Sequence, residues 1–276
     1  MGSPFVSGGS GVRSMDNKFS YDSANAQRID RQYAAPSLLE QRRRTLETMA
    51  LQPGQTALDI GCGPGYLTLE MARQVGARGR VIAVDTSQPM LDIARARCAG
   101  PDQIEFHLAD AAVLPCPDAS IDVAAAVQVY LFAPDLDVVV RDLARVLRPG
   151  GRAVVIDTDW DSVVWHSSDR DRMERLLAVW TQRYANARIA RLLPGALRRA
   201  GLKVEHAGAI PIVELDPGEI TYSGSQVTEL ARYVVSKGGI PAAEANAWEE
   251  DLRSLAKRGE YFFSLNRYLF VASKPR

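Results

Sequence analysis

Cysteine is scarce in this sequence, and neither sign of charge is in excess. Only Cys62, Cys98 and Cys116 occur among 276 residues, and their wide spacing fits neither a disulfide framework nor a zinc site. We therefore expect reduced thiols, a cytoplasmic location and no bound metal. Lysine plus arginine and aspartate plus glutamate both total 33. Because no basic surplus exists to contact phosphates, we expect no nucleic-acid partner.

Long apolar runs are also missing. No stretch reaches the roughly 18 apolar residues that span a bilayer, and no secretory signal is present, so we expect no membrane partner. Residues 1–14 are dominated by glycine and serine and precede Met15, which predicts a disordered leader or tag. With 46% hydrophobic and 24% charged residues, the rest of the chain has the composition of a globular protein.

Apolar strands and helical patterns alternate between residues 56 and 159. Strands are predicted at 56–60, 81–85, 104–110, 121–130 and 152–159, and helices at 36–51, 67–76, 90–98 and 135–147. Strands that are apolar on both faces and joined by helices predict a parallel sheet with both faces covered. Right-handed crossovers make such a sheet doubly wound. Its ligand is expected beyond the carboxyl ends of the strands.

The pattern changes after residue 159. Further helices are predicted at 172–185, 188–201 and within 219–259, and strands at 203–215 and 260–274, with Pro211 favouring a bend or a sheet edge. We expect residues 15–158 to form the ligand-binding core with its N-terminal helices, and residues 159–276 to form the remainder of the sheet. The insertions at about 159–187 and 217–258 are predicted to be a helical lid that excludes water from the site.

Three glycines directly follow the first predicted strand. Gly61, Gly63 and Gly65 permit a sharp turn and a close approach of the backbone to a ligand, because no Cβ intervenes. The dinucleotide pattern GxGxxG fails at Tyr66, and no Gly-Lys-Ser/Thr follows for a phosphate-binding loop. Asp59 disfavours a pyrophosphate and suits a ligand with an ammonium group. The predicted ligand is therefore adenosine-containing and cationic.

The segment ALDIGCGPG (57–65) resembles the first motif of the class I S-adenosylmethionine (SAM)-dependent methyltransferases. Three more segments resemble family motifs in the same order, namely VIAVDTSQPML (81–91), HLADAAVLPCPDASIDVAAAVQVY (107–130) and RVLRPGGRAVV (145–155). The resemblance covers about residues 36–158 and is nearest to the ubiquinone/menaquinone-biosynthesis type. It implies a Rossmann-like α/β fold, with a mostly parallel seven-stranded sheet whose last strand is antiparallel. It also implies methylation of oxygen, carbon or nitrogen on an aromatic, quinol-like or natural-product small molecule.

The resemblance also implies which residues bind SAM. Asp85 should accept hydrogen bonds from both ribose hydroxyls, although a carboxylate is also common at a helix N-terminus. Met90 should pack over the adenine or in the core, and Asp110 should accept from the adenine amino group, with the Ala111 N–H facing a ring nitrogen. Gln128 should touch the methionine portion or else satisfy backbone groups. The predicted set, in which Cys62 offers its backbone N–H, is Asp59, Gly61, Cys62, Gly63, Asp85, Thr86, Met90, Asp110, Ala111 and Gln128.

The loop after the fifth strand, DTDWDSVVWHSSD (157–169), should reach the methyl group. His166 is the candidate general base because histidine exchanges protons near pH 7, although a structural role is the alternative. Trp160 and Trp165 are candidates for an aromatic wall facing the substrate, or for core residues of the lid. Tyr130 and Phe132, which follow the fourth strand, are candidates for contact with the sulfonium through an aromatic face, and Tyr130 also for contact with the substrate.

Alternatives from other classes of protein stay open. A cyclase with a methyltransferase fold binds SAM without transferring the methyl group, whereas a regulatory protein with a relic fold is disfavoured by the intact glycines, Asp85 and Asp110. A homodimer stays open beside a monomer. Residues 217–258 and the stretch before Tyr33 are expected to move or become ordered when ligand binds.

Overall fold

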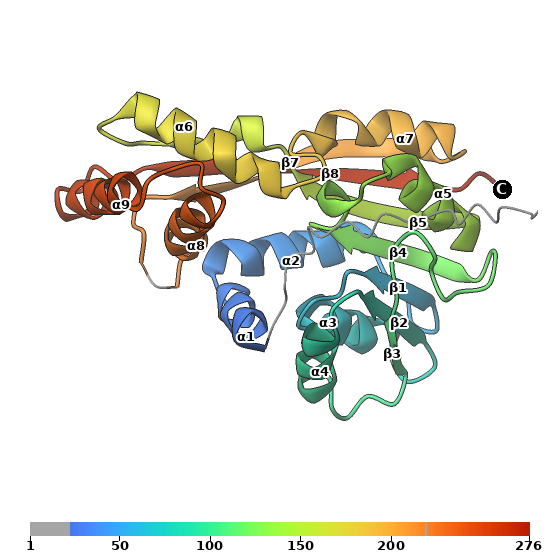
Figure 1. The fold of residues 1–276 in the computed structure, drawn as a ribbon. Helices are drawn as coiled ribbons and strands as arrows, with labels where there is room; N and C mark the ends of the chain where they lie inside the picture. Colours follow the sequence, from blue (N-terminus) through green and yellow to red (C-terminus); the bar gives the residue numbers. More distant parts are fainter. Residues whose placement is uncertain (1–22, 219) are drawn as a thin grey trace, which may run out of the picture.

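The computed structural model describes residues 23–218 and 220–276, which form one sheet with helices on both of its faces (Figure 1). The predicted leader, residues 1–14, lies outside the described residues. None of the described helices combines the length and the apolar character needed to cross a bilayer.

The sheet has the predicted doubly wound, mostly parallel architecture. Its strands are β1 (Thr56–Ile60), β2 (Arg80–Asp85), β3 (Ile104–Leu108), β4 (Ile121–Val127), β5 (Leu147–Thr158), β6 (Val164–Trp165), β7 (Lys203–Glu214) and β8 (Phe263–Ser273). The order is β3-β2-β1-β4-β5-β8, and β6 and β7 both pair with β8. Strands β1 to β5 are parallel, and β8 is antiparallel to its neighbours. Seven strands match the prediction, and the two-residue β6 is an eighth that the sequence did not predict.

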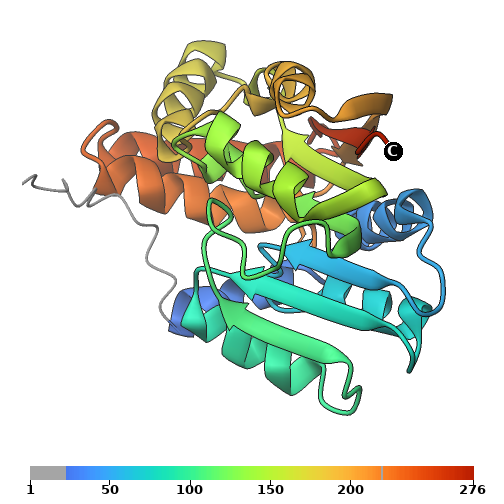
Figure 2. The ribbon, with the colours of Figure 1, turned by 90° about the vertical axis from the view of Figure 1, so that its right-hand side faces the viewer.

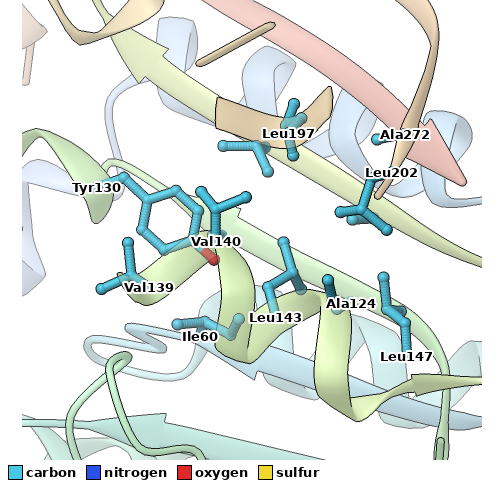
Figure 3. Close-up of a cluster of buried hydrophobic side chains, with 14 of the residues drawn as sticks. Ile60, Ala124, Tyr130, Val139, Val140, Leu143, Leu147, Leu197, Leu202 and Ala272 are labelled. Atoms are coloured by element: carbon cyan, nitrogen blue, oxygen red, sulfur yellow. The ribbon is translucent and has the colours of Figure 1, made fainter. Parts of the chain in front are cut away.

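Helices cover both faces because the central strands are apolar on both sides. The helices are α1 (Ser23–Gln32), α2 (Pro36–Met49), α3 (Tyr66–Val75), α4 (Gln88–Arg97), α5 (Leu136–Val146), α6 (Arg170–Trp180), α7 (Leu193–Arg199), α8 (Tyr222–Ser236) and α9 (Ala242–Lys257), with 3-10 turns η1 (Tyr130–Phe132), η2 (Trp160–Ser162), η3 (Thr181–Arg183) and η4 (Ile189–Arg191). Ala124 and Ala126 of β4 face α5 and α7 (Figure 3), whereas Val123 and Ala125 face α2 and α3. Small strand residues thus let helices approach both faces closely.

Two strand boundaries differ from the predicted ones. β4 ends at Val127 because Gln128 adopts a left-handed conformation with φ of 60°, and η1 follows. β5 begins at Leu147, five residues earlier than predicted, because Leu147 already pairs with Ile121 of β4. The predicted edge position of Pro211 is confirmed, since β7 pairs with β8 alone among the described strands.

The helices α6, α8 and α9 form a helical cap beside the outer ends of β7 and β8. In both views the cap lies at the end of the sheet opposite β2 and β3 (Figures 1 and 2). Its own core contains Trp165, Trp180 and Trp248 and continues onto Phe263 and Leu265 of β8. The cap helices fall within the two insertions predicted as a lid.

Candidate active site

The glycine loop connects β1 to α3 at the carboxyl edge of the sheet. Gly61, Gly63 and Gly65 have φ angles of 67°, 52° and 81°, in the left-handed region that other residues rarely adopt. A Cβ on Gly61 would lie 2.4 Å from Cγ2 of Val129, and one on Gly65 would lie 2.9 Å from Cβ of Ala94. The loop is therefore held between the segment entering η1 and α4, and only glycine fits at these two positions.

Asp85, at the end of β2, holds this loop in place. Its Oδ2 accepts a hydrogen bond from the Gly63 N–H at 2.8 Å, and its Oδ1 accepts one from the Ser87 N–H at 2.9 Å. Burial raises the pKa of this carboxyl. A carboxylate has about four acceptor positions, so others remain for the hydroxyls of a ribose. The ribose contact stays a prediction, and the bond to Gly63 adds a role in shaping the loop.

A second carboxyl, that of Asp59, lies in β1 just before the loop. Asp59 is only 2% exposed and accepts a hydrogen bond from the Thr68 hydroxyl at 2.6 Å. Burial raises its pKa to about 7, although the Thr68 hydroxyl opposes the shift. This carboxyl also lines the cleft described next. A cation placed beside it would lower its pKa and stabilise the ionised form.

A cleft opens beside the glycine loop and reaches the helical cap. With its open mouth, which includes open solvent, it encloses about 1170 Å³ of empty space. Asp59, Gly61 and Cys62 line it at the glycine loop, and Gln128 and Trp160 line it from the ends of β4 and β5. These five sequence-predicted residues therefore come together in one cleft.

Hydrogen bonds within the protein already engage polar groups of two of these residues. The N–H of Cys62 donates to the carbonyl of Val84 at 2.9 Å, so the prediction that it faces a ligand is wrong. Burial also raises the pKa of the Cys62 thiol, which leaves a neutral, weakly polar contact. The Oε1 of Gln128 accepts a hydrogen bond from the Thr158 hydroxyl at 2.7 Å. Its Nε2 donates to the Ile156 carbonyl of β5 at 3.3 Å, which confirms the alternative that Gln128 satisfies backbone groups, and its contact with the methionine portion stays a prediction.

The other predicted cofactor residues follow β2 and β3. Thr86 and Asp110 are exposed, Ala111 is half-buried, and Met90 is buried in the first turn of α4. They lie at the same sheet edge as Asp85 because β2 and β3 are parallel neighbours. They do not line the cleft itself. Their contacts with adenosine stay predictions.

Three residues predicted on the substrate side lie elsewhere. The His166 side chain is exposed beyond β6, and its backbone N–H donates to the carbonyl of Phe262 at 2.9 Å. Trp165 is buried in the cap core, and its indole N–H donates to the Tyr261 hydroxyl at 3.1 Å. Tyr130 is fully buried in the core beside α5 (Figure 3). None of the three lines the cleft, and this placement contradicts their predicted catalytic and substrate roles.

The pairing of β6 with β8 explains why His166 leaves the site. Val164 and Trp165 pair with Ser264 and Phe263, so the chain turns toward the cap core directly after η2. Of the loop predicted to reach the methyl group, residues 157–169, only the part up to Trp160 therefore lies at the cleft.

Replacing His166 with glutamine should leave methyl transfer within about twofold of the unmodified rate. The side chain is exposed and lies outside the cleft, whereas loss of a general base costs about 10²–10⁴ in rate. Initial rates with a radiolabelled methyl donor measure the effect. A loss of tenfold or more with unchanged SAM affinity would restore His166 as the base.

Trp160 is 4% exposed and packs in the cap core, which confirms the alternative prediction, and it also lines the cleft as part of an aromatic wall. Its ring stacks on that of Tyr184, with centroids 5.4 Å apart and planes at 21°, and the centroid of the Phe132 ring lies 5.3 Å from that of Tyr184. All three residues line the cleft. Aromatic side chains favour stacked or edge contacts with other rings, so this wall suits a flat, apolar acceptor.

Helix α1 ties the sheet core to the helical cap. Asp30 pairs with Arg97 of α4 at 2.9 Å, and Arg28 pairs with Glu229 of α8 at 2.7 Å. Tyr33 follows α1 and lines the cleft. The helix therefore closes the cleft on the side of the glycine loop, and its ordering by ligand stays a prediction.

Arg267, in β8, is a cleft residue that the sequence analysis missed. It is 5% exposed, and its Nη1 donates a hydrogen bond to Oε1 of Gln41. The alternation of apolar and polar residues along this strand could have identified Arg267 from the sequence. Phe263, Leu265 and Leu269 are buried at every second position, and Arg267 occupies the same face. A charge on the buried face of a strand indicates a site.

The glycine loop, the acidic ends of β1 and β2 and the order of the strands are features of the class I SAM-dependent methyltransferase fold, and the chain carries a methyltransferase domain. Residues 57–151 match the family model described as a methyltransferase domain. This match contains the glycine loop, Asp59, Asp85 and Gln128.

Known proteins resemble this chain over different fractions of its length. An uncharacterised 37.1 kDa protein in transposon Tn4556 of Streptomyces fradiae is 33% identical over 231 residues, covering 82% of this chain and 65% of the relative. The 2-phytyl-1,4-naphtoquinone methyltransferase of Synechococcus elongatus is 40% identical over 119 residues, covering 42% and 51%. The chain thus spans less than two thirds of the one relative and about half of the other. Among solved structures, the [4+2]-cyclase SpnF superposes with a TM-score of 0.55 at 25% identity, over 86% of this chain and 80% of that one.

Proposed function

We propose that this protein binds SAM at the glycine loop and transfers its methyl group to a small-molecule acceptor in the adjoining cleft. The observation that carries the proposal is the bond between Asp85 and the Gly63 N–H. It joins a ribose-binding type of carboxylate to a loop in which Gly61 and Gly65 leave no room for a Cβ. The methyltransferase domain match over residues 57–151 supports the same assignment.

The chain's own groups fit a cationic adenosine derivative. Asp85 would hold the ribose, and Asp59 would face the ammonium group, which favours its ionised form. SAM supplies an activated methyl group on a sulfonium sulfur. The protein therefore has to align the acceptor and exclude water, and it needs no nucleophile of its own. The helical cap and α1 supply the enclosure, and Gln128 lies at the end of the central strand β4.

The acceptor we propose is aromatic or quinol-like, and it presents an oxygen, nitrogen or carbon nucleophile. The wall of Trp160, Tyr184 and Phe132 supports a flat ring system. The name of the Synechococcus relative, a naphtoquinone methyltransferase, points in the same direction. Among the described residues that line the cleft there is no histidine, and the acidic residues are Asp59 and Glu229.

A cyclase is the second candidate function. It is favoured by one observation, the likeness to the cyclase SpnF over 86% of this chain. The two functions differ in stoichiometry, because transfer consumes one SAM per product whereas a cyclase leaves SAM unchanged. Product mass and SAM consumption, measured together with the same acceptor, separate them.

Replacing Asp85 with alanine should weaken SAM binding by about 1.5–3 kcal/mol, as for lost hydrogen bonds to a charged group. This corresponds to a roughly tenfold to hundredfold rise in Kd, measured by calorimetry with SAM and S-adenosylhomocysteine. Asp92→Ala is a matched control, because Asp92 lies on nearby α4 with its side chain 64% exposed. Micromolar binding of NADH by the unmodified protein, with no binding of SAM, would overturn the proposal.

A further inference from the structure

The charge of Arg267 is buried without an ionic partner. The guanidinium is always protonated, and the residue is 5% exposed. Its contacts are a hydrogen bond from Nη1 to Gln41 Oε1 and the Tyr222 ring, which lies 5.0 Å from Cζ. Its Nε has no hydrogen-bond partner. Within residues 23–218 and 220–276 no carboxylate forms an ion pair with it, although the buried Asp157 interacts with it electrostatically, and the arginine charge opposes the rise that burial causes in the pKa of that carboxyl. Buried charges in proteins are normally paired, so a partner is missing here.

The acids of the cleft are already engaged. The carboxylate oxygens of Glu229 lie 2.7 Å, 2.6 Å and 3.7 Å from guanidinium nitrogens of Arg28, Arg232 and Arg183, respectively. The other acidic residue that lines the cleft, Asp59, lies at the glycine loop and accepts a bond from a threonine hydroxyl. The cap side of the cleft therefore has an excess of positive charge, and it favours a ligand that brings an anion.

The position of Arg267 in the sheet separates it from the expected donor site. It pairs with Thr158 of β5 and Ile210 of β7, so β4 and β5 lie between its strand and β1. With strands about 4.8 Å apart, β8 lies on the order of 14 Å from β1, which precedes the glycine loop. The predicted donor site spans β2, β1 and the end of β4, and the strand of Arg267 lies beyond it. The guanidinium also interacts electrostatically with Tyr33, whose hydroxyl lies close to Gly63, and Arg267 lines the same cleft as the aromatic wall.

We propose that the acceptor is an aromatic carboxylic acid whose carboxylate pairs with Arg267 while its ring packs against Trp160 and Tyr184. The inference rests on the proposed function and narrows its acceptor from aromatic compounds in general to anionic ones. Arginine presents a planar fork of donors that matches the two oxygens of a carboxylate. The hydrogen bond to Gln41 and the Tyr222 ring fix that fork before the ligand arrives.

The test compares matched anionic and neutral probes. The unmodified protein is first titrated with S-adenosylhomocysteine, and the saturated complex is then titrated with 2-naphthoate and 2-naphthamide, and with 4-hydroxybenzoate and 4-hydroxybenzamide. The carboxylates should bind at least tenfold more tightly than the amides. Arg267→Met and Arg267→Gln should abolish this preference, and Arg267→Lys should retain part of it. Arg253→Met on the surface of α9 should leave it unchanged, because that side chain is 57% exposed.

Each outcome separates this inference from the proposed function. Absence of S-adenosylhomocysteine binding to the unmodified protein overturns the proposed function and the inference with it. Normal S-adenosylhomocysteine binding with equal affinity for carboxylates and amides overturns the inference alone. A preference for carboxylates that remains in Arg267→Met also overturns the inference alone. If Arg267→Met instead weakens S-adenosylhomocysteine tenfold and spares the probe preference, the arginine serves the donor's own carboxylate and the inference is wrong.

Discussion

Replacing Gly61 with alanine should lower SAM affinity by at least a hundredfold and destabilise the fold by about 2–4 kcal/mol. The new Cβ would lie 2.4 Å from Cγ2 of Val129 at a φ of 67°, so overpacking and left-handed strain add together. Relief requires the loop to shift, and that shift breaks the bond that Asp85 makes to it. Calorimetry with SAM and denaturant unfolding measure the two effects.

Two further variants isolate the steric cause. Gly63→Ala has similar backbone strain, with φ of 52°, but its Cβ would meet only the Tyr33 hydroxyl at 3.6 Å. It should therefore destabilise by only about 1–2 kcal/mol. Adding Val129→Ala to Gly61→Ala removes the clash and should recover most of the lost affinity, as a positive coupling in a double-mutant cycle. A double variant no better than Gly61→Ala would show that packing against Val129 is not the cause.

SAM affinity should rise about tenfold per pH unit up to about pH 7 and level off above it. The pKa of Asp59 is raised by burial to about 7, and a ligand ammonium group binds the ionised carboxylate. Below pH 7 the site must first release a proton, which costs about a factor of ten per unit. Calorimetry in buffers of different ionisation enthalpy should show this proton release. Asp59→Asn should flatten the profile and hold the affinity near its acid-side value.

Asp157 provides a control for this pH dependence. It is fully buried, and burial raises its pKa to about 8, but it does not line the cleft. For both carboxyls the folded-state pKa lies above the unfolded value near 4. The folded state therefore binds the extra proton, and stability without ligand falls as the pH rises from about 4 to 8. Asp157→Asn should reduce that fall and leave the pH profile of SAM affinity unchanged. A change in the affinity profile would contradict the role given to Asp59.

The parallel core was predictable because local and long-range signals agree there. The apolar run that became β1 is followed at once by Gly61, and the run that became β2 ends in Asp85. Parallel neighbours bring such residues to one edge of the sheet. The cleft residues Asp59 and Gln128 follow from the same rule. Sequence position alone was enough for these residues, because each lies directly at a strand end.

The substrate side was not predictable in the same way. His166 and Trp165 follow β5 in sequence, but β6 pairs with β8 and takes them away from the cleft. Tyr130 follows β4, but the left-handed Gln128 redirects the chain into the core. These turns depend on tertiary pairing that no local pattern encodes. Arg267 was predictable in principle from strand alternation, but its strand lies far along the chain from every motif.

The last strand in the sequence, β8, lies between β5 and β7 in the sheet, so the sheet cannot be completed until the end of the chain has been synthesised. The strands β1 to β5 and their helices emerge first, while one edge of β5 stays open and β7 has no partner among the described strands. The whole helical cap is made before β8 arrives to fill the gap. Open strand edges recruit other chains, and pairing over long sequence separations is slow. During synthesis the donor half of the protein is therefore complete while the edges of β5 and β7 are still unpaired. The nascent chain can aggregate through these edges until β8, which carries Arg267, pairs with both strands.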